Sequence, residues 1–325
     1  MSQNLTSASA EITVSPDSTT FTITIIQVIY GLPSFIFLIF FFIFLGLGKN
    51  YSGSFYRMVQ FDLLTNIATY ANTWIAIRLL KYPSGIMFLK GLESIFPGIL
   101  TWSVYLTGWF MHMQFLSAAA LSFHRITSVI WHHSYERVWS RYYPLFGLLV
   151  CIYSTLCEAI LPGKTIYYSI VDGVLTQSRD AARGGQAMGL IAYFSVFYFL
   201  LLATVNSCTA YFVARKFKAA NMSDRGVGRK LTKIAITYCF ISIGIIFWTV
   251  TTLLNARFQL VKSLFAISLT LLSFVSDLMT LALPYILFLY DTNVKNDLCI
   301  GKNKHKVSSV VVSIGPTSKS LGTTS

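Results

Sequence analysis

Ionisable side chains inside the apolar stretches of this chain are few, and they are the residues best placed to do chemistry. Asp62 stands early in one stretch, with Asn66 one helical turn later, while Glu158 and Asp277 stand in two others. A charge is costly inside a membrane, so such residues are functional candidates by default. We interpret Asp62 and Asn66 as a structural polar anchor between helices, because each can hydrogen-bond the other. Glu158 lies close enough to the end of its stretch to reach the membrane interface.

An aromatic face with one histidine marks the stretch that begins at Ile99. Four residues recur there at helical spacing and share one face: Trp102, Tyr105, Trp109 and His112. Ligand pockets are mostly apolar with a few polar groups. We predict that this face lines a pocket, with Trp248 at its floor and with His112 and Asp277 as polar ligand contacts. The alternative is plain helix packing, in which these side chains contact only neighbouring helices.

The same stretch ends in His124-Arg125-Ile126, after a run from Ile99 to Phe123 that has no charged side chain. A guanidinium at this position can extend to the lipid headgroups. It can also act as a switch that contacts neighbouring helices at rest and a cytosolic partner when active. We take His124 and Arg125 as candidate coupling residues.

Catalytic and metal-binding patterns are absent from the sequence. Five histidines, of which one lies in the middle of an apolar stretch and one in the tail, are too few for the histidine boxes of a membrane di-iron oxidase. There is no nucleophile–base pair, phosphate-binding loop or CxxC motif. We therefore expect no enzymatic activity, no cofactor and no metal site.

Composition places the chain in the membrane class. Of its 325 residues 54% are hydrophobic and only 11% are charged, with a mean hydropathy of +0.62; a soluble domain carries about 25% charged residues. The net charge of +13 comes from short segments between apolar runs and not from one basic face. This distribution argues against a nucleic-acid partner and for membrane lipids as the surroundings.

Seven apolar runs, each long enough for a membrane-spanning helix, predict an all-α, seven-transmembrane helix bundle at residues 22–290. A polar N-terminal segment, 1–21, precedes it, and a tail, 291–325, follows it and reads as disordered. The runs lie near 22–47, 56–80, 98–124, 143–162, 187–214, 233–254 and 263–289.

Loop charge predicts the orientation of the bundle. With the N-terminus outside, the inner segments hold 17 of the 25 Lys and Arg residues and the outer segments hold 8. The positive-inside rule then makes the N-terminus extracellular and the tail cytoplasmic. Asn4 of the sequon Asn4-Leu5-Thr6 is a glycosylation site in this orientation.

The longest outer connection runs from Gly163 to Gln186. Within it, β-prone residues from Thr165 to Val171 and from Val174 to Gln177 flank Asp172-Gly173. An Asp-Gly pair between such runs favours a β-hairpin, and the alternative is a flexible loop. A hairpin there would lie over the mouth of the bundle.

Several motifs resemble those of nematode chemoreceptors of the serpentine receptor class gamma. In the second apolar run they are Phe55-Tyr56-Arg57, Asp62-Leu63-Leu64-Thr65-Asn66, Asn72-Thr73-Trp74 and Arg78. In the third run and the segment after it they are Pro97-Gly98-Ile99-Leu100-Thr101-Trp102, His112-Met113-Gln114-Phe115-Leu116-Ser117, His124-Arg125-Ile126-Thr127-Ser128 and Tyr135-Glu136-Arg137-Val138-Trp139-Ser140.

This resemblance implies a seven-helix G-protein-coupled receptor in the plasma membrane, at the ciliated endings of chemosensory neurons. It implies a small environmental or pheromone molecule as ligand and a heterotrimeric G protein as partner. His124-Arg125 stands where rhodopsin-like receptors carry an acidic residue, arginine and tyrosine. The acid is missing here, which leaves the resting partner of Arg125 open.

Two other functions are open. A seven-span ligand-gated channel of the insect odorant-receptor kind places its N-terminus in the cytosol, opposite to the charge bias of this chain. A secondary transporter is expected to show paired repeats and helices broken at mid-membrane, and the sequence shows neither. A receptor could work as a monomer or as a heteromer with a related receptor.

Overall fold

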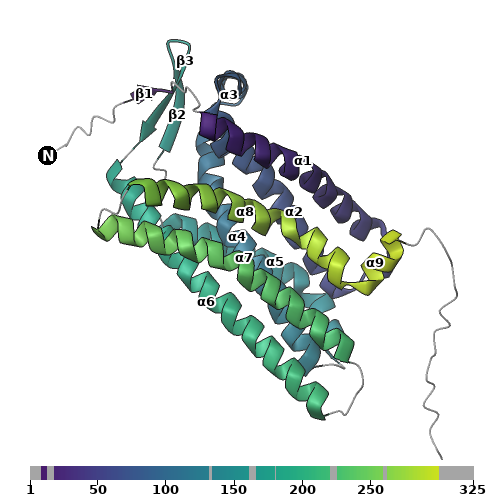
Figure 1. Ribbon diagram of the computed structural model, residues 1–325. Coiled ribbons are helices and arrows are strands. Elements are labelled where there is room, and N and C mark those ends of the chain that lie inside the picture. The colour runs from purple at the N-terminus through teal and green to yellow at the C-terminus, as the bar shows by residue number, and fades with distance from the viewer. Residues whose placement is uncertain are drawn as a thin grey trace, which may run out of the picture.

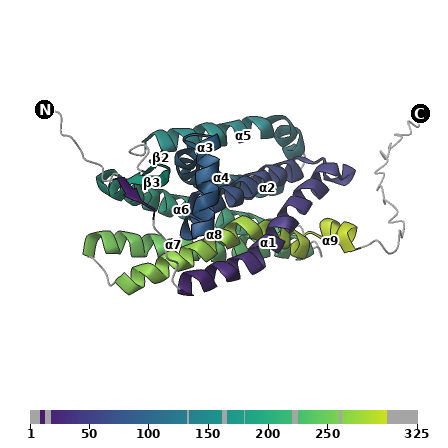
Figure 2. The ribbon, with the colours of Figure 1, turned by 90° about the horizontal axis from the view of Figure 1, so that it is seen from above.

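Seven long helices form a single bundle in the computed structural model (Figure 1). The structure describes residues 9–12, 18–131, 134–160, 166–179, 181–219, 225–258 and 262–299. The long helices are α1 (Ser18–Leu47), α2 (Ser54–Thr73), α4 (Ile99–Ile130), α5 (Tyr135–Ile160), α6 (Ala181–Ala219), α7 (Arg225–Phe258) and α8 (Lys262–Tyr290). Figure 2 shows α4 in the middle of the bundle, with α5 on one side and α1 and α8 on the other. The predicted all-α, seven-helix class is confirmed.

The long helices run beyond the apolar stretches that predicted them. α5 begins at Tyr135 and α7 at Arg225, about two turns before the predicted starts at 143 and 233. Hydropathy identifies the part of a helix that suits lipid, whereas backbone hydrogen bonding continues through polar and basic turns at its ends. Among the described residues, four helical segments are long and apolar enough to cross a membrane by length and composition alone: Ser18–Leu47, Tyr135–Ile160, Gly189–Phe212 and Thr270–Tyr290.

One end of the bundle carries a small sheet and a short helix, and we call it the sheet end. The strands β1 (Ser9–Glu11), β2 (Ile166–Val171) and β3 (Val174–Arg179) are antiparallel in the order β1-β3-β2. Asp172 and Gly173 join β2 to β3 with φ of 49° and 74°, the left-handed pair that a tight hairpin turn requires. The hairpin is therefore present. The helix α3 (Pro83–Ile95) beside it was not predicted.

The opposite end, which we call the α9 end, carries the short helix α9 (Thr292–Cys299). The expectation of disorder from residue 291 onward is wrong for this segment, because Asp291 caps the helix: its Oδ1 accepts the backbone N–H of Asn293 at 3.0 Å. Tyr51 and Tyr56 also hold this segment, since their hydroxyls donate to Asp297 at 2.7 Å and to Asp291 at 2.9 Å. Residues 300–325 and Asn4 lie outside the described residues.

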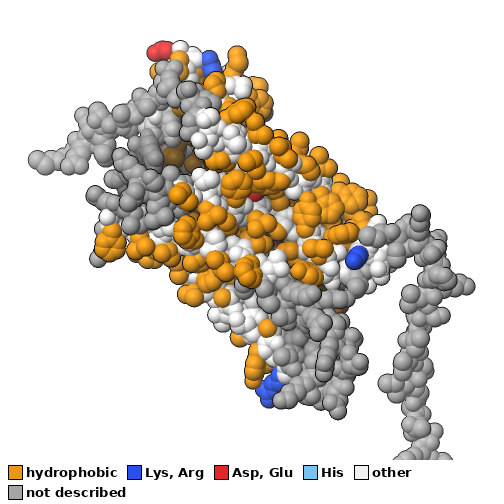
Figure 3. Space-filling model, viewed as in Figure 1, with side chains coloured by type: hydrophobic (Ala, Val, Ile, Leu, Met, Phe, Trp, Pro, Cys, Tyr) orange, Lys and Arg blue, Asp and Glu red, His pale blue; other side chains and the backbone are white. Residues whose placement is uncertain are grey.

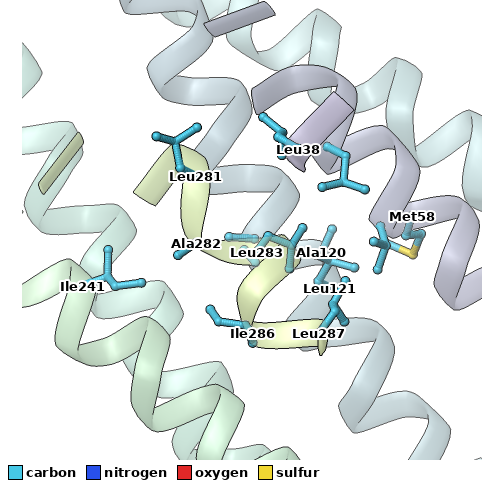
Figure 4. Packing of buried hydrophobic residues seen from close by; sticks show 14 of the residues in the cluster. Leu38, Met58, Ala120, Leu121, Ile241, Leu281, Ala282, Leu283, Ile286 and Leu287 are labelled. Atoms are coloured by element: carbon cyan, nitrogen blue, oxygen red, sulfur yellow. The ribbon is translucent and has the colours of Figure 1, made fainter. Parts of the chain in front are cut away.

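Apolar side chains fill the centre of the bundle and also cover much of its flank. Leu38, Leu121, Leu283 and Leu287 are almost fully buried where α1, α4 and α8 meet (Figure 4). On the flank, apolar side chains are exposed along the lengths of α1 and α5 and spread over the face seen in Figure 3. An apolar surface of this extent suits contact with lipid tails, which solvate it as well as a protein core does.

Candidate functional site

A cavity of about 500 Å³ lies inside the bundle, with lining residues from α1, α2, α4, α6, α7 and α8. This volume is in the range of small-molecule sites, about 300–1,000 Å³. Its polar lining includes Gln27, Thr69, Thr107, Gln114 and Ser276, and its apolar lining includes Met111, Phe115, Ile245, Trp248 and Leu272. An apolar chamber with a few convergent polar groups is the usual form of a ligand site.

The end of α2 shapes one wall of the cavity. After Thr73 the chain forms a π-helical turn, Trp74–Arg78, and then a 3₁₀ turn, Leu79–Lys81. Such π turns are often found at functional sites. They bring Arg78 and Lys81 into the lining. Burial of the ammonium group and the neighbouring Arg78 guanidinium lower the pKa of Lys81.

Arg78 forms a buried ion pair with Asp277 of α8, from its Nη2 to the carboxylate Oδ1. The other oxygen, Oδ2, accepts a hydrogen bond from the Tyr30 hydroxyl at 2.7 Å. The guanidinium also lies over the rings of Tyr70 and Trp74, with its Cζ 5.1 and 5.0 Å from their centroids. These contacts tie α1, the end of α2 and α8 together beside the cavity.

Of the predicted ligand contacts, Trp248 lines the cavity and Asp277 lies behind its wall, holding Arg78. The predicted aromatic face does not line it. Trp102 is 51% exposed, and Trp109 donates from Nε1 to Thr155 Oγ1 of α5 at 3.2 Å. The α4 residues that do line the cavity are Thr107, Gly108, Met111, Gln114 and Phe115. They occupy a different face of the helix from Trp102, Tyr105 and Trp109.

His112 is completely buried and is not part of the cavity lining. Its Nδ1 lies 2.6 Å from the Tyr198 hydroxyl of α6, and its Nε2 lies 3.7 Å from Glu158 Oε1 of α5. Glu158 therefore points into the bundle and not to the interface. It also lies against Gly108, where an added Cβ would stand 2.2 Å from its Oε1. This glycine thus makes room for the carboxylate.

A chain of hydrogen bonds leads from the cavity wall toward the α9 end. Gln114 donates from Nε2 to Asn66 Oδ1 at 2.7 Å and to Thr280 Oγ1 at 3.0 Å. Asn66 donates from Nδ2 to Asp62 Oδ2 at 3.0 Å, and Ser117 donates to Asp62 Oδ1. Asp62 and Asn66 thus link α2 to α4, which is the geometry that a structural polar anchor needs.

His124 and Arg125 are both buried at the α9 end, 2% and 4% exposed. His124 Nε2 and Ser54 Oγ are hydrogen-bonded at 2.9 Å, and Ser54 donates from Oγ to Glu136 Oε2 at 2.7 Å. The Arg125 guanidinium lies 5.7 Å from the centroid of the Phe55 ring.

Sequence reasoning named Arg78 only among the motifs of the family resemblance and missed it as a member of the site. The sequence did contain a signal for this cation: Asp277 is a carboxylate inside an apolar run, and such a group is stabilised by a cation at the same depth. Among the described residues, no group of three or more His, Cys, Asp or Glu is placed to hold a metal ion.

Comparison with known proteins gives consistent matches along almost the whole chain. The family model described as Srg family chemoreceptor matches residues 24–298. Serpentine receptor class gamma-47 of Caenorhabditis elegans is 30% identical over 283 residues, which cover 87% of this chain and 92% of that protein. Serpentine receptor class gamma-53 of the same organism is 27% identical over 278 residues, or 84% and 90% of the two chains.

Proposed function

The chain belongs to the Srg family of chemoreceptors, and from this premise we propose that it detects a small environmental or pheromone molecule and activates a heterotrimeric G protein. The observation that carries the proposal is the link between two sites: a small-molecule cavity within the bundle, and Arg125 near the α9 end. Gln114 of α4 belongs to the cavity wall and to the hydrogen-bond chain that runs through Asn66 to Asp62 of α2, in the direction of the α9 end.

In the proposed orientation the sheet end is extracellular and the α9 end is cytoplasmic. The distribution of Lys and Arg supports this orientation, with 17 in the inner segments against 8 in the outer ones. A ligand would then enter beside the hairpin of β2 and β3, and the G protein would dock where α9 lies. We place the receptor in the plasma membrane of chemosensory cilia, the location that the family resemblance implies.

Ligand binding can shift the bundle only if the ligand contacts differ between two states. The cavity has lining residues on α4 and α8, and Gln114 of α4 hydrogen-bonds Thr280 of α8. A ligand that competes for the Gln114 amide would loosen that contact and the bond to Asn66 with it. The contacts of Asp62 and Asn66 that link α2 to α4 would then weaken, the two helices would shift against each other, and Arg125 of α4 would become available to the cytosolic partner.

The experiment is a calcium response in cells that carry the receptor, a promiscuous Gα and an N-terminal tag for surface quantification. Nematode-conditioned medium and volatile odorants are the stimuli, with and without co-expression of a related receptor. Arg125→Ala should abolish the response at unchanged surface level. Arg141→Ala, which removes an exposed arginine near the same end of α5, should retain it. A full response from the Arg125 variant would contradict coupling through Arg125 and would favour the channel.

A further inference from the structure

The charged groups of the cavity are unevenly balanced. Arg78 and Lys81 are the charged side chains among its described lining residues. Asp277 neutralises one of these cations through its ion pair with Arg78. Glu158 contacts Gly108 from α5 but is not among the lining residues. Two cations against one carboxylate leave a single positive charge beside an otherwise largely apolar chamber.

Arg78 also has an unused hydrogen-bond donor. Its side chain is 7% exposed, and Nη2 bonds Asp277 while the buried Nη1 has no hydrogen-bond partner among the described residues. A buried donor without an acceptor is costly, and guanidinium groups are well suited to a second planar acceptor because their donors are arranged in a fixed fork. Arg78 lines the cavity but its Nη1 is covered, so a ligand there can supply the missing acceptor once the guanidinium turns toward it.

The rest of the lining restricts the remainder of such a ligand. Phe115, Ile245 and Trp248 face the cavity from α4 and α7, so the body of the ligand should be apolar. A cationic ligand would be repelled by Arg78 and Lys81. A doubly charged phosphate would bring more negative charge than the single excess positive charge can balance, whereas one carboxylate matches it.

We infer that the ligand is a small amphipathic carboxylate, whose carboxylate binds Nη1 of Arg78 with Lys81 as a second cation and whose apolar body lies against Trp248 and Phe115. This inference rests on the proposed function, in which the cavity is the ligand site, and it adds the chemical class of the ligand. In this arrangement Asp277 keeps its bond to Nη2, so the guanidinium bridges the receptor carboxylate and the ligand carboxylate.

The test uses the purified full-length receptor in nanodiscs and a matched series of probes. Hexanoate through dodecanoate and phenylpropanoate are each compared with their methyl esters and primary amides, which keep the shape and remove the charge. Binding is measured by thermal stabilisation and by isothermal titration. We expect carboxylates to stabilise the receptor in a saturable way and their esters and amides to be at least about 10-fold weaker, the typical loss of one charge-assisted hydrogen bond.

Variants locate the binding. The pair Arg78→Gln with Asp277→Asn removes both charges together and so avoids an unpaired buried charge; it should weaken carboxylate binding about 10- to 100-fold. Lys81→Gln should weaken it less, by about 3- to 10-fold, because Lys81 is partly exposed. Lys90→Gln, an exposed lysine of α3 at the same end, should leave binding unchanged and is the matched control.

Equal binding of acids and esters, no binding by any acid, or unchanged binding in the Arg78/Asp277 double variant would each overturn the inference. These outcomes are distinguishable from failure of the proposed function. If the receptor signals only in response to neutral molecules, the proposed function stands and the inference of a carboxylate ligand is refuted. If the receptor binds carboxylates in nanodiscs but activates no G protein with them or with conditioned medium, the inference of a carboxylate ligand is supported and the proposed function is refuted.

Discussion

Replacing Asp277 by Asn should destabilise the protein by about 3–5 kcal/mol, the range for a buried ion pair that loses one partner. The magnitude follows from burial, because the side chains of Arg78 and Asp277 are 7% and 2% exposed and water cannot solvate the charge that remains. Asn keeps the size of the side chain, and its oxygen can still accept the Tyr30 hydroxyl, which donates to Asp277 at 2.7 Å. The decrease in the free energy of unfolding therefore measures the cost of leaving the Arg78 guanidinium unpaired.

The partner variants separate the ion pair from its surroundings. Arg78→Gln alone should also cost about 3–5 kcal/mol, whereas the double variant with Asp277→Asn should cost about 1–2 kcal/mol because no buried charge remains. The coupling energy between the two positions would then be at least about 4 kcal/mol. The assay is the free energy of unfolding of the purified receptor in one detergent, with Lys90→Gln as a control that should stay within about 0.5 kcal/mol of wild type.

Additive losses would refute this reasoning. If the double variant costs as much as the two single variants together, Arg78 and Asp277 do not stabilise each other. The cavity wall would then depend on packing alone, as in the contacts of the guanidinium with Tyr70 and Trp74. A double variant close to wild type in stability would confirm the pair and would also make it usable in the binding experiment.

Two further perturbations test the packing around the site and the end of the bundle. Gly108→Ala should destabilise the receptor by about 1–3 kcal/mol, because the new Cβ would stand 2.2 Å from Glu158 Oε1. The matched control is Gly91→Ala in α3, where a Cβ meets nothing within 4 Å. Equal thermal stability of the two variants would contradict the close contact between Gly108 and Glu158. Tyr51→Phe removes the hydrogen bond to Asp297, 2.7 Å long, and should lower the local stability of α9 by about 1–2 kcal/mol. Hydrogen exchange should then speed up about 5- to 30-fold in 292–299 and not in α4; unchanged exchange in α9 would show that this bond does not hold the helix.

The sequence predicts the membrane class and the helices because both depend on composition and on runs of apolar residues. It also indicates the hairpin, since Asp172-Gly173 provides the two left-handed positions of the turn. Hydropathy does not predict α9, whose sequence is polar. That helix depends on the cap at Asp291 and on its contacts with Tyr51 and Tyr56, which are distant in the chain.

The candidate site is harder to predict because it depends on which helix faces meet. Helical spacing places Trp102, Tyr105 and Trp109 on one face of α4, but it does not say which neighbour that face contacts, and the structure puts Trp109 against Thr155 of α5. The partner of Asp277 is 199 residues away, so no local pattern identifies it. The chemical type of a residue is a better guide to the site than its helical spacing. A carboxylate in an apolar run requires a polar partner, whichever helix supplies it.

In the proposed function, ligand binding in the cavity and G-protein activation through Arg125 occur at separate sites that are coupled. The most direct test measures both in purified receptor reconstituted with a G protein: probe binding by titration and nucleotide exchange on Gα. For Arg125→Ala we expect probe binding within about 3-fold of wild type and no stimulated exchange, since Arg125 is not among the cavity lining residues. Stimulated exchange at the wild-type rate in this variant would contradict coupling through Arg125.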